Sequence, residues 1–327
     1  MIATRMGSAT QAGVRMENIR WCYMDHWREP SARGTMTPYA SVRHADRFIK
    51  QLAALGFEGL DTFYFSLPAQ RALFGSLKGF EAFLRERGMQ KVVSVFFAKP
   101  TGSPGWFFHR REDHQNIVDF CSRLMDQCAE LALENFIVMP TNTHWQMEPI
   151  TDDSLHILAD LWNRVGEVTR RHGVRTSIHH EFWGGIRTWD QIEKFYAWTD
   201  PELVWFFCDT AQHVIAGVDP VQLYERYHQR CSGFHFKDTH DVDNQEDYRR
   251  PPDAELVAPT VQRWFWEMGT PAGLVDFPAV MRALRKHGYR GWLSLEHDKA
   301  DIGGGNFAES TAVAKWYADN VLSPIYR

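Results

Sequence analysis

Short runs of β-branched and aromatic residues alternate along this chain with longer segments in which apolar residues recur every three or four positions. The first pattern predicts strands and the second predicts amphipathic helices. The strand pattern occurs at residues 19–24, 59–65, 92–97, 135–140, 176–181, 204–213, 233–238 and 291–298. The helix pattern occurs at residues 41–55, 78–88, 112–132, 154–173, 188–197, 219–229, 276–287 and 307–321. This order of elements is typical of an α/β protein with a parallel sheet.

Strand–helix pairs in this number, joined by right-handed crossovers, close into a (β/α)8 TIM barrel. The alternative is an open, doubly wound sheet, which normally carries a glycine-rich phosphate-binding turn after its first strand. No such turn follows residues 19–24. A chain of 327 residues without an evident linker fits one barrel, so we expect a single domain over residues 1–327. The long stretch 239–273 is expected to be a lid or an interface insertion on the barrel.

Consecutive strand segments in the second half of the chain each end in a side chain that can bind a metal. The last strong ligands of these segments are Glu181, Asp209, His235 and Glu296. The carboxyl ends of parallel barrel strands meet at one mouth, so these side chains converge although they are far apart in sequence. One imidazole and three carboxylates suit Mn²⁺, Mg²⁺ or Co²⁺ better than a structural zinc ion. The pattern therefore predicts one divalent cation at the mouth of the barrel.

Two further residues bear on this predicted metal site. Side chains alternate along a strand, so His179 shares a face with Glu181 and is the alternative first ligand or a substrate-binding group beside it. Three carboxylates exceed the charge of a divalent ion by one, and a nearby cation is therefore expected. Lys237 follows the predicted histidine ligand on the same face and is the candidate for that charge and for a catalytic role. A structural ion pair with Asp61 or Asp238 is the alternative for Lys237.

Several segments resemble a known family. They are FCDTAQH (207–213), GFHFKD (233–238), FWEMGTPAGLVDFPAVMRAL (265–284) and YRGWLSLEHD (289–298). From about residue 40 onward the chain resembles the xylose isomerase-like TIM barrels of the sugar phosphate isomerase/epimerase superfamily, and among them inosose dehydratase and its relatives. The resemblance implies a divalent cation, most often Mn²⁺, at the ligands named above, with Co²⁺, Mg²⁺ or Fe²⁺ as alternatives.

The resemblance also bears on two histidines. The Asp-x-x-x-His element implies that His213 lies close to the metal or contacts the substrate. Dehydratase-like members tend to show His-x-His where this chain has His179-His180-Glu181, and the first ligand is therefore either His179 or Glu181.

Aromatic residues make up 14% of the chain, and many of its 13 Trp fall in predicted loops. We expect Trp145, Trp183 and Trp266 to line a substrate pocket, because loop aromatics at the strand-exit end of a barrel often do so. We also expect Trp264, Phe265 and Trp266 to be exposed and to form an interface. The aromatic loops are similar to those of C-glycoside deglycosidase catalytic subunits, which act on 3-oxo-glucosides and pair with a small β-rich subunit. That resemblance implies an oligomer, with a small second subunit as one alternative.

The predicted metal site indicates a class of reaction. A carboxylate-held divalent cation can bind a carbonyl and the neighbouring hydroxyl of a sugar and stabilise the enediolate formed when the carbon beside the carbonyl loses a proton. His144, just after the fourth predicted strand, is the first candidate for the base, followed by Glu148, His179 and His213. The resemblance favours a lyase that eliminates a β-substituent from a keto-sugar or keto-polyol. Isomerisation or epimerisation through the same enediolate is the alternative.

Composition argues against other classes. A net charge of −5 disfavours nucleic acid as a partner, and the absence of a long apolar run predicts no membrane span. The scattered cysteines and the polar amino-terminal residues predict reduced thiols and a cytoplasmic location. A metal-dependent endonuclease on this barrel would need a basic groove and additional histidines. A non-catalytic binding protein or partner subunit would hold no metal at the predicted ligands.

Overall fold

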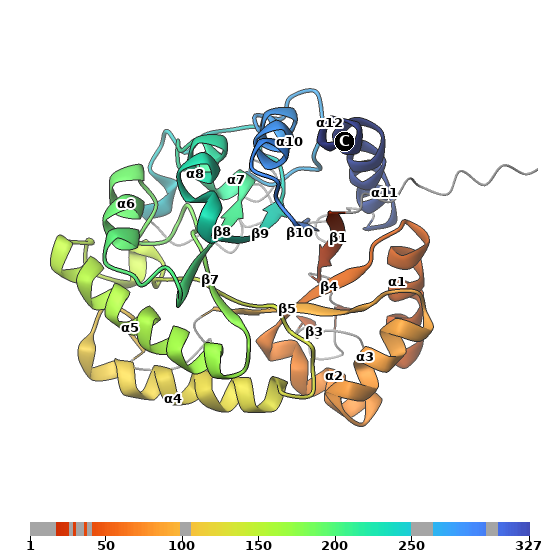
Figure 1. Cartoon of the computed structure of the whole chain (residues 1–327), viewed down its shortest axis with the longest axis horizontal. Helices are drawn as coiled ribbons and strands as arrows, with labels where there is room; N and C mark the ends of the chain where they lie inside the picture. Colours follow the sequence, from red (N-terminus) through yellow and green to blue (C-terminus); the bar gives the residue numbers. More distant parts are fainter. Residues whose placement is uncertain are drawn as a thin grey trace, which may run out of the picture.

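The computed structural model describes residues 18–25, 29–30, 36–37, 41–98, 106–249, 264–298 and 307–327. Eight parallel strands form a closed barrel (Figure 1), in which each barrel strand pairs with the next barrel strand along the chain. The strands are β1 (Ile19–Met24), β4 (Gly59–Phe63), β5 (Lys91–Phe97), β6 (Asn135–Val138), β7 (Arg175–His179), β8 (Val204–Asp209), β9 (Cys231–Phe236) and β10 (Gly291–Leu295). Because β1 pairs with both β4 and β10, the barrel closes and the predicted TIM-barrel fold is confirmed.

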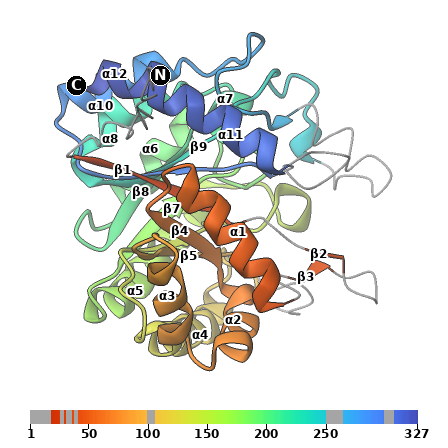
Figure 2. The ribbon, with the colours of Figure 1, turned by 90° about the vertical axis from the view of Figure 1, so that its right-hand side faces the viewer.

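Helices form an outer ring around the strands (Figure 1). They are α1 (Val42–Ala54), α2 (Leu67–Phe74), α3 (Leu77–Glu86), α4 (Arg111–Cys128), α5 (Asp152–Arg171), α6 (Trp189–Ala197), α7 (Thr210–Ile215), α8 (Pro220–Tyr227), α10 (Phe277–Lys286), α11 (Phe307–Tyr317) and α12 (Ser323–Tyr326). A short antiparallel pair, β2 (Glu29–Pro30) and β3 (Met36–Thr37), lies beyond one end of the barrel in Figure 2.

Polar side chains fix where several helices begin. Ser41 caps α1 by accepting a hydrogen bond from a backbone N–H of the first turn, and Thr151 and Thr188 do the same for α5 and α6. Asp209 is both the last residue of β8 and the N-cap of α7, where its Oδ1 accepts a 2.9 Å hydrogen bond from the Gln212 N–H. Oδ1 of this carboxylate thus caps the helix, and Oδ2 takes no part in the cap.

The inside of the barrel is filled by side chains from alternate positions of the strands. Met24, Phe96, Ile137 and Phe207 form one apolar cluster there. The ring centroids of Phe96 and Phe207 lie 6.1 and 4.8 Å from that of His235. A packed interior of this kind is general in TIM barrels, and here its aromatic rings pack against the imidazole of His235.

The structure differs from the sequence-based prediction in a few elements. Helix α2 was not predicted, because it is short and its sequence LPAQRALF lacks a clear helical stripe. Residues 210–213, assigned to a strand segment, form the start of α7, since Asp209 ends β8 and caps a helix. The predicted helix 307–321 changes to a π-helical turn at Ala318–Leu322.

The long insertion 239–273 is described only in part, because residues 250–263 fall outside the described residues. A backbone bridge between Asp238 and Trp266 joins its far end to the end of β9. No helix in the described ranges has the length and apolar character needed to cross a membrane. All five cysteines are free thiols.

Candidate metal centre

The carboxyl ends of β7 to β10 bring four ionisable side chains together. They are His179, Asp209, His235 and Glu296, all of them buried. One ligand atom from each lies within 4.8 Å of the others. His179 and Asp209 end their strands, His235 is inside β9, and Glu296 directly follows β10. The four come from neighbouring strands and therefore face one centre at the mouth of the barrel.

Three distances within this group are close to those of adjacent ligands around one ion, and a fourth is longer. His235 Nδ1 lies 2.9 Å from Glu296 Oε2 and 3.1 Å from His179 Nε2. His179 Nε2 lies 3.2 Å from Asp209 Oδ2, which in turn is 4.0 Å from His235 Nδ1. Ligand atoms about 2.1 Å from a divalent cation are about 3.0–3.4 Å apart in octahedral or tetrahedral geometry. Two imidazole nitrogens and two carboxylate oxygens at this spacing fit such an ion.

Glu181, the favoured first ligand in the sequence, is not part of this group. Its Oε1 lies 3.1 Å from His179 Nδ1, on the side of the imidazole that faces away from the centre. Alternation puts both residues on one face, but the chain has left β7 at residue 179, so the Glu181 carboxylate reaches the outer nitrogen. The group of four thus contains the alternative, His179, and not Glu181, and which of the two binds an ion stays a prediction. Glu181 Oε2 has no hydrogen-bond partner in the described part of the chain.

Asp61 occupies the equivalent place beside His235. It lies on β4, and its Oδ2 is 3.7 Å from His235 Nε2, the nitrogen that faces away from the centre. Metal-bound histidines commonly donate their second N–H to a carboxylate, which holds the ring in one orientation. From the sequence, Asp61 is expected only as an ion-pair partner of Lys237. The available signal was a carboxylate on the inward face of a barrel strand.

The ammonium group of Lys237 lies among the carboxylates. Its Nζ is 3.1 Å from Asp209 Oδ2, 2.9 Å from Glu296 Oε2 and 2.8 Å from Asp298 Oδ2. The side chain is 1% exposed, and the ring centroid of Phe265 lies 4.3 Å from Nζ. Among the described residues, Lys237 does not form the alternative ion pair with Asp61 or Asp238. Asp298, two residues after a predicted ligand, was missed.

Burial and charge shift the pKa values of this group in opposite directions. Burial lowers the pKa of His179, but Glu181 and Asp209 outweigh it and raise the pKa to about 10. Burial likewise lowers the pKa of Lys237, and the surrounding carboxylates raise it well above its ordinary value. Burial raises the pKa of Glu181. Without an ion, protonated nitrogens thus face carboxylates, and a cation would have to displace protons from imidazole to bind here.

Loops after β6 and β7 meet beside the mouth, where the structure places His144. This residue begins a 3-10 turn (His144–Gln146), and its N–H donates a 2.7 Å hydrogen bond to the Trp183 carbonyl. Its ring stands perpendicular to that of Tyr248 with centroids 4.7 Å apart, and Arg187 stacks on the same tyrosine at 3.6 Å. Burial, followed by two nearby guanidinium groups, lowers the pKa of His144. The imidazole is therefore neutral at pH 7 and can accept a proton.

An aromatic cluster covers this side of the mouth. Trp264 and Phe265 are 0% and 5% exposed and pack with Phe182 and Tyr248. The expectation that Trp264 and Phe265 are exposed is therefore wrong, because the insertion folds back and packs against Phe182 and α7 in a small separate core. Trp183 packs against this cluster and remains half-buried.

The other predicted pocket tryptophans are half-buried. Trp266 stacks on His240, with ring centroids 4.2 Å apart and planes 3° from parallel. Trp145 follows His144 in the same turn. Their role in substrate binding stays a prediction.

His213 lies on α7, in the layer between the barrel and its helices. Its ring centroid is 5.9 Å from that of His180 and 5.9 Å from that of Phe206, both of which face the outer core. Burial lowers the pKa of His213 to about 4, so the ring is neutral. The structure thus places His213 outside the group of four ligands. This geometry does not favour direct contact with a substrate at the mouth.

This chain is similar in sequence to a family model and to several named relatives. Residues 49–318 match the family model described as xylose isomerase-like TIM barrel. An inosose dehydratase of Lacticaseibacillus casei is 30% identical over 173 residues, which are 53% of this chain and 56% of the relative. An inosose dehydratase of Bacillus licheniformis is 28% identical over 216 residues, which are 64% of this chain and 70% of the relative. The chain thus matches about half to two thirds of the length of these relatives.

Solved structures with the same barrel have much lower sequence identity. L-ribulose 3-epimerase superimposes with a TM-score of 0.69 at 14% identity, over 94% of each chain. The IOLI protein with a bound zinc atom gives 0.68 at 14% identity, over 94% of this chain and 99% of the other. A xylose isomerase-like TIM barrel protein from Mycobacterium smegmatis in complex with magnesium gives 0.66 at 14% identity, over 95% and 98%. At these identities the likeness shows the fold.

Proposed function

We propose, from the premise that this chain belongs to the xylose isomerase-like TIM barrel family, that it is a divalent-metal-dependent enzyme acting on a keto-sugar or keto-polyol. The observation that carries the proposal is the convergence of His179, Asp209, His235 and Glu296 at the carboxyl end of the barrel. TIM-barrel enzymes hold their active sites at this end. The inosose dehydratase relatives favour a lyase, which removes a proton beside a carbonyl and expels a β-substituent.

The donor set bears on the choice of ion. A divalent cation at this centre would act as a Lewis acid toward a carbonyl oxygen and the neighbouring hydroxyl oxygen. Mg²⁺ prefers oxygen ligands, whereas two imidazoles and two carboxylates suit Mn²⁺, Fe²⁺ or Co²⁺. We propose Mn²⁺, the ion that the resemblance implied.

The residues around the group supply proton transfer and charge. His144 is neutral and half-buried, and Glu181 is buried with an oxygen that lacks a hydrogen-bond partner in the described part of the chain. Each is a candidate for the base that takes the proton from carbon. The electron pair of the broken C–H bond then moves into the enediolate. Lys237, fixed by three carboxylates, places a positive charge beside the site where negative charge develops. The expelled substituent leaves with a proton returned from one of these groups.

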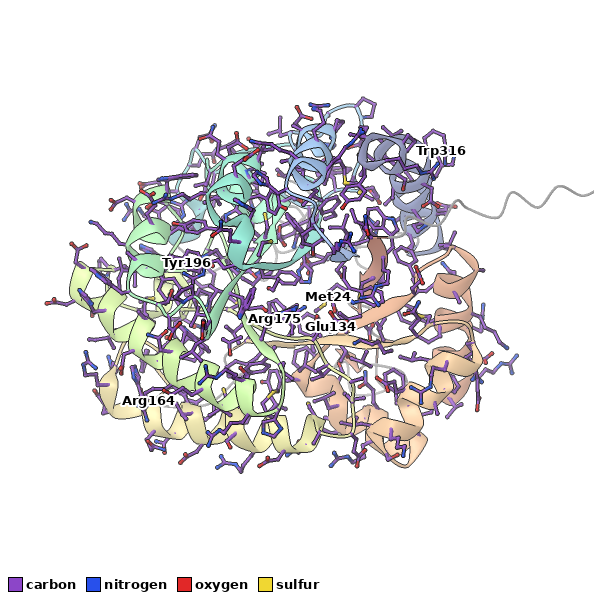
Figure 3. All side chains as sticks on the ribbon, viewed as in Figure 1. Met24, Glu134, Arg164, Arg175, Tyr196 and Trp316 are labelled. Carbon is purple, nitrogen blue, oxygen red and sulfur yellow. The ribbon has the colours of Figure 1, made fainter. Side chains whose placement is uncertain are left out.

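A C-glycoside substrate is the second candidate. The observation that favours it is Trp183, which packs on the buried cluster of Phe182, Trp264 and Phe265 and stays half-buried, so that part of its ring is left to contact an aromatic aglycone. An oligomer or a small second subunit is part of this proposal. Val313 and Trp316 on α11 support it, since they are 53% and 63% exposed and Trp316 lies at the periphery in Figure 3.

Elemental analysis tests the metal. We expect about one Mn, Co or Fe per chain in the wild type and none in Glu296→Ala. The truncation removes one ligand, and Lys237 then pairs with the carboxylates that remain. Glu202→Ala, which removes a carboxylate whose side chain is 82% exposed, is the matched control and keeps the ion. A wild-type protein without metal, even after soaking in Mn²⁺, would sink the proposal.

A pair of isosteric variants distinguishes the two candidates for the first ligand. His179→Gln should lose the ion, and Glu181→Gln should keep it while losing activity. The opposite result would make Glu181 the ligand and His179 its neighbour. Loss of the ion in both variants would place both residues in the coordination sphere.

Substrate assays test the reaction. Inososes, keto-sugars and 3-oxo-C-glucosides are offered to the loaded enzyme, and elimination is followed by the ultraviolet absorbance of the unsaturated ketone. Incorporation of deuterium from D₂O without loss of a substituent would instead favour isomerisation or epimerisation. A loaded enzyme that does neither with any of these classes contradicts the proposed substrate class.

A further inference from the structure

The amino-terminal end of the barrel contains a cavity of about 430 Å³ that the proposed function does not use. It is lined by Arg20, Glu134, Arg175, Trp205, Ser232 and Arg290, among others. Arg175 is the first residue of β7, whose last residue is the candidate ligand His179. At about 3.3 Å per residue, the strand separates this cavity from the metal group by about 13 Å. The two sites therefore lie at opposite ends of the same strands.

The lining of this cavity is positively charged in a protein whose net charge is −5. Three guanidinium groups and one carboxylate face it, a formal charge of +2 (three minus one). The carboxylate, Glu134, is already engaged: it accepts a 2.9 Å hydrogen bond from Trp292 Nε1 and pairs with Lys91 at 2.9 Å and Arg20 at 3.6 Å. Burial raises its pKa, but these contacts outweigh it and lower the pKa. Glu134 thus stays ionised and committed to its own partners.

Arg175 and Arg290 make no ion pair or hydrogen bond through their guanidinium groups within the described residues. Both residues are exposed, so water solvates their guanidinium groups in the absence of a ligand. The Arg175 guanidinium lies over the ring of Trp205, 5.1 Å from its centroid. Stacking of this kind holds a guanidinium in place and leaves its N–H edges free to donate. Figure 3 shows Arg175 and Glu134 close together in the middle of the ring of strands, in agreement with their common place in the cavity lining.

A second groove with basic residues makes a useful contrast. Arg282, Arg285 and Lys286 line it, and each of these side chains contacts a carboxylate or a backbone carbonyl of the chain itself. Two of these charges are therefore offset by carboxylates, and the third group is held by a carbonyl oxygen. The cavity at the amino-terminal end differs because two of its guanidinium groups have no such counterpart.

We propose that this cavity binds a small multivalent oxyanion, such as phosphate, a phosphate ester or a di- or tricarboxylate, between Arg175 and Arg290. Guanidinium groups match phosphate and carboxylate oxygens in a bidentate manner. A cavity of this size is within the range of small-molecule sites. A bound anion joins the start of β7 to the start of β10 and stabilises the barrel, because it binds the folded chain alone. This site is independent of the metal centre, so its test does not depend on the proposed reaction.

Titration calorimetry with inorganic phosphate and with citrate tests the proposal on protein freed of metal with EDTA. The wild type should bind one anion per chain and melt at a higher temperature in its presence. Arg175→Gln/Arg290→Gln should weaken binding at least about tenfold and lose the thermal shift. Arg290→Gln alone, in the turn before β10, should weaken binding with less risk to folding. Preference for phosphate over citrate, or the reverse, identifies the kind of anion.

The control is Arg170→Gln/Arg171→Gln, at the end of α5, which removes the same charge from outside the cavity. It should bind both anions as the wild type does, and Glu296→Ala should also bind them. Equal weakening in the control would show a general effect of charge and overturn the proposal. No heat and no thermal shift in the wild type up to about 10 mM of either anion would overturn it as well.

Discussion

The two ends of the barrel treat charged residues in opposite ways. At the carboxyl end, His179, Asp209, His235 and Lys237 are buried, and each contacts a group of opposite charge. At the amino end, Glu134 pairs with Lys91 and Arg20, but Arg175 and Arg290 are exposed and have no such contacts in the described part of the chain. Both sets belong to the same short strands or the turns next to them.

The difference shows how one pattern of inward residues serves two purposes. Buried charges are costly unless their partners are held in place, and a network that holds them is positioned to coordinate an ion or a substrate. Charges in contact with water cost little and need no fixed partner, so they remain available to a ligand that arrives later. A charge removed from the carboxyl end should therefore cost far more than the same charge removed from the amino end.

The largest expected effect follows removal of one cation from the carboxyl end. In metal-free protein, Lys237→Met leaves Asp209, Glu296 and Asp298 without their common ammonium, and the free energy of unfolding should fall by about 3–5 kcal/mol. Arg175→Met, the matched variant at the other end, should change it by less than about 0.5 kcal/mol. Urea unfolding in EDTA measures both. Equal losses in the two variants would break the comparison.

Much of the barrel could be predicted because burial imposes a local pattern. The strand 19–24 and the helix 41–55 agree with β1 and α1 to within a residue, since one face of each must be apolar. Helix α7 could not be predicted in this way, because it follows from a cap at Asp209, a residue that also ends a strand.

The site was predictable in outline and not in detail. Carboxylates and imidazoles at strand ends identified the region, because parallel strands bring their ends together. The choice of His179 over Glu181 depends on where β7 ends, to within two residues, which sequence does not specify. The burial of Trp264 and Phe265 depends on how a long insertion folds back, and no local pattern encodes that contact.

A buried carboxylate near the mouth sharpens the comparison through its pH dependence. Asp238 is 2% exposed, its Oδ1 accepts hydrogen bonds from the N–H groups of Thr239 and Val275, and its backbone pairs with Trp266. Burial raises its pKa to about 6, although these hydrogen bonds lower it. The folded protein therefore binds more protons here than the unfolded chain between about pH 4 and 6. This contribution to stability is complete at pH 4 and lost as the pH rises past 6.

Asp238→Asn removes this titration and keeps the shape of the side chain. From pH 4 to pH 7 the free energy of unfolding of the wild type should fall relative to that of the variant by up to about 3 kcal/mol, which corresponds to two pKa units. Urea unfolding at several pH values measures the difference. Asp190→Asn, an exposed carboxylate on α6, is the control. Parallel profiles for Asp238→Asn and the wild type would contradict a costly buried carboxylate at this end.

The smallest expected effect concerns Asp61, which acts on the metal through His235. With Nδ1 of that ring facing the centre, Nε2–H faces the Asp61 carboxylate at 3.7 Å. Asp61→Asn keeps an acceptor of similar shape and removes the charge, so the ring becomes a weaker donor to the ion. We expect metal affinity to fall about 10–100-fold. Chelator competition measures the affinity, and the visible spectrum of the Co²⁺-loaded protein reports a change at the ligand itself, which a loss of stability alone would not produce.

Thr62→Val is the matched control on the same strand. Thr62 points to the opposite face, where its hydroxyl accepts a 2.8 Å hydrogen bond from Gln70, so the variant perturbs the fold around β4 without touching the group of ligands. It should lower stability and leave both the affinity and the Co²⁺ spectrum unchanged. If the two variants weaken metal binding equally, Asp61 acts through the packing of β4 and not through His235. If only Asp61→Asn does so, the buried network of the carboxyl end extends one residue beyond the ligands, which is the property that the amino end lacks.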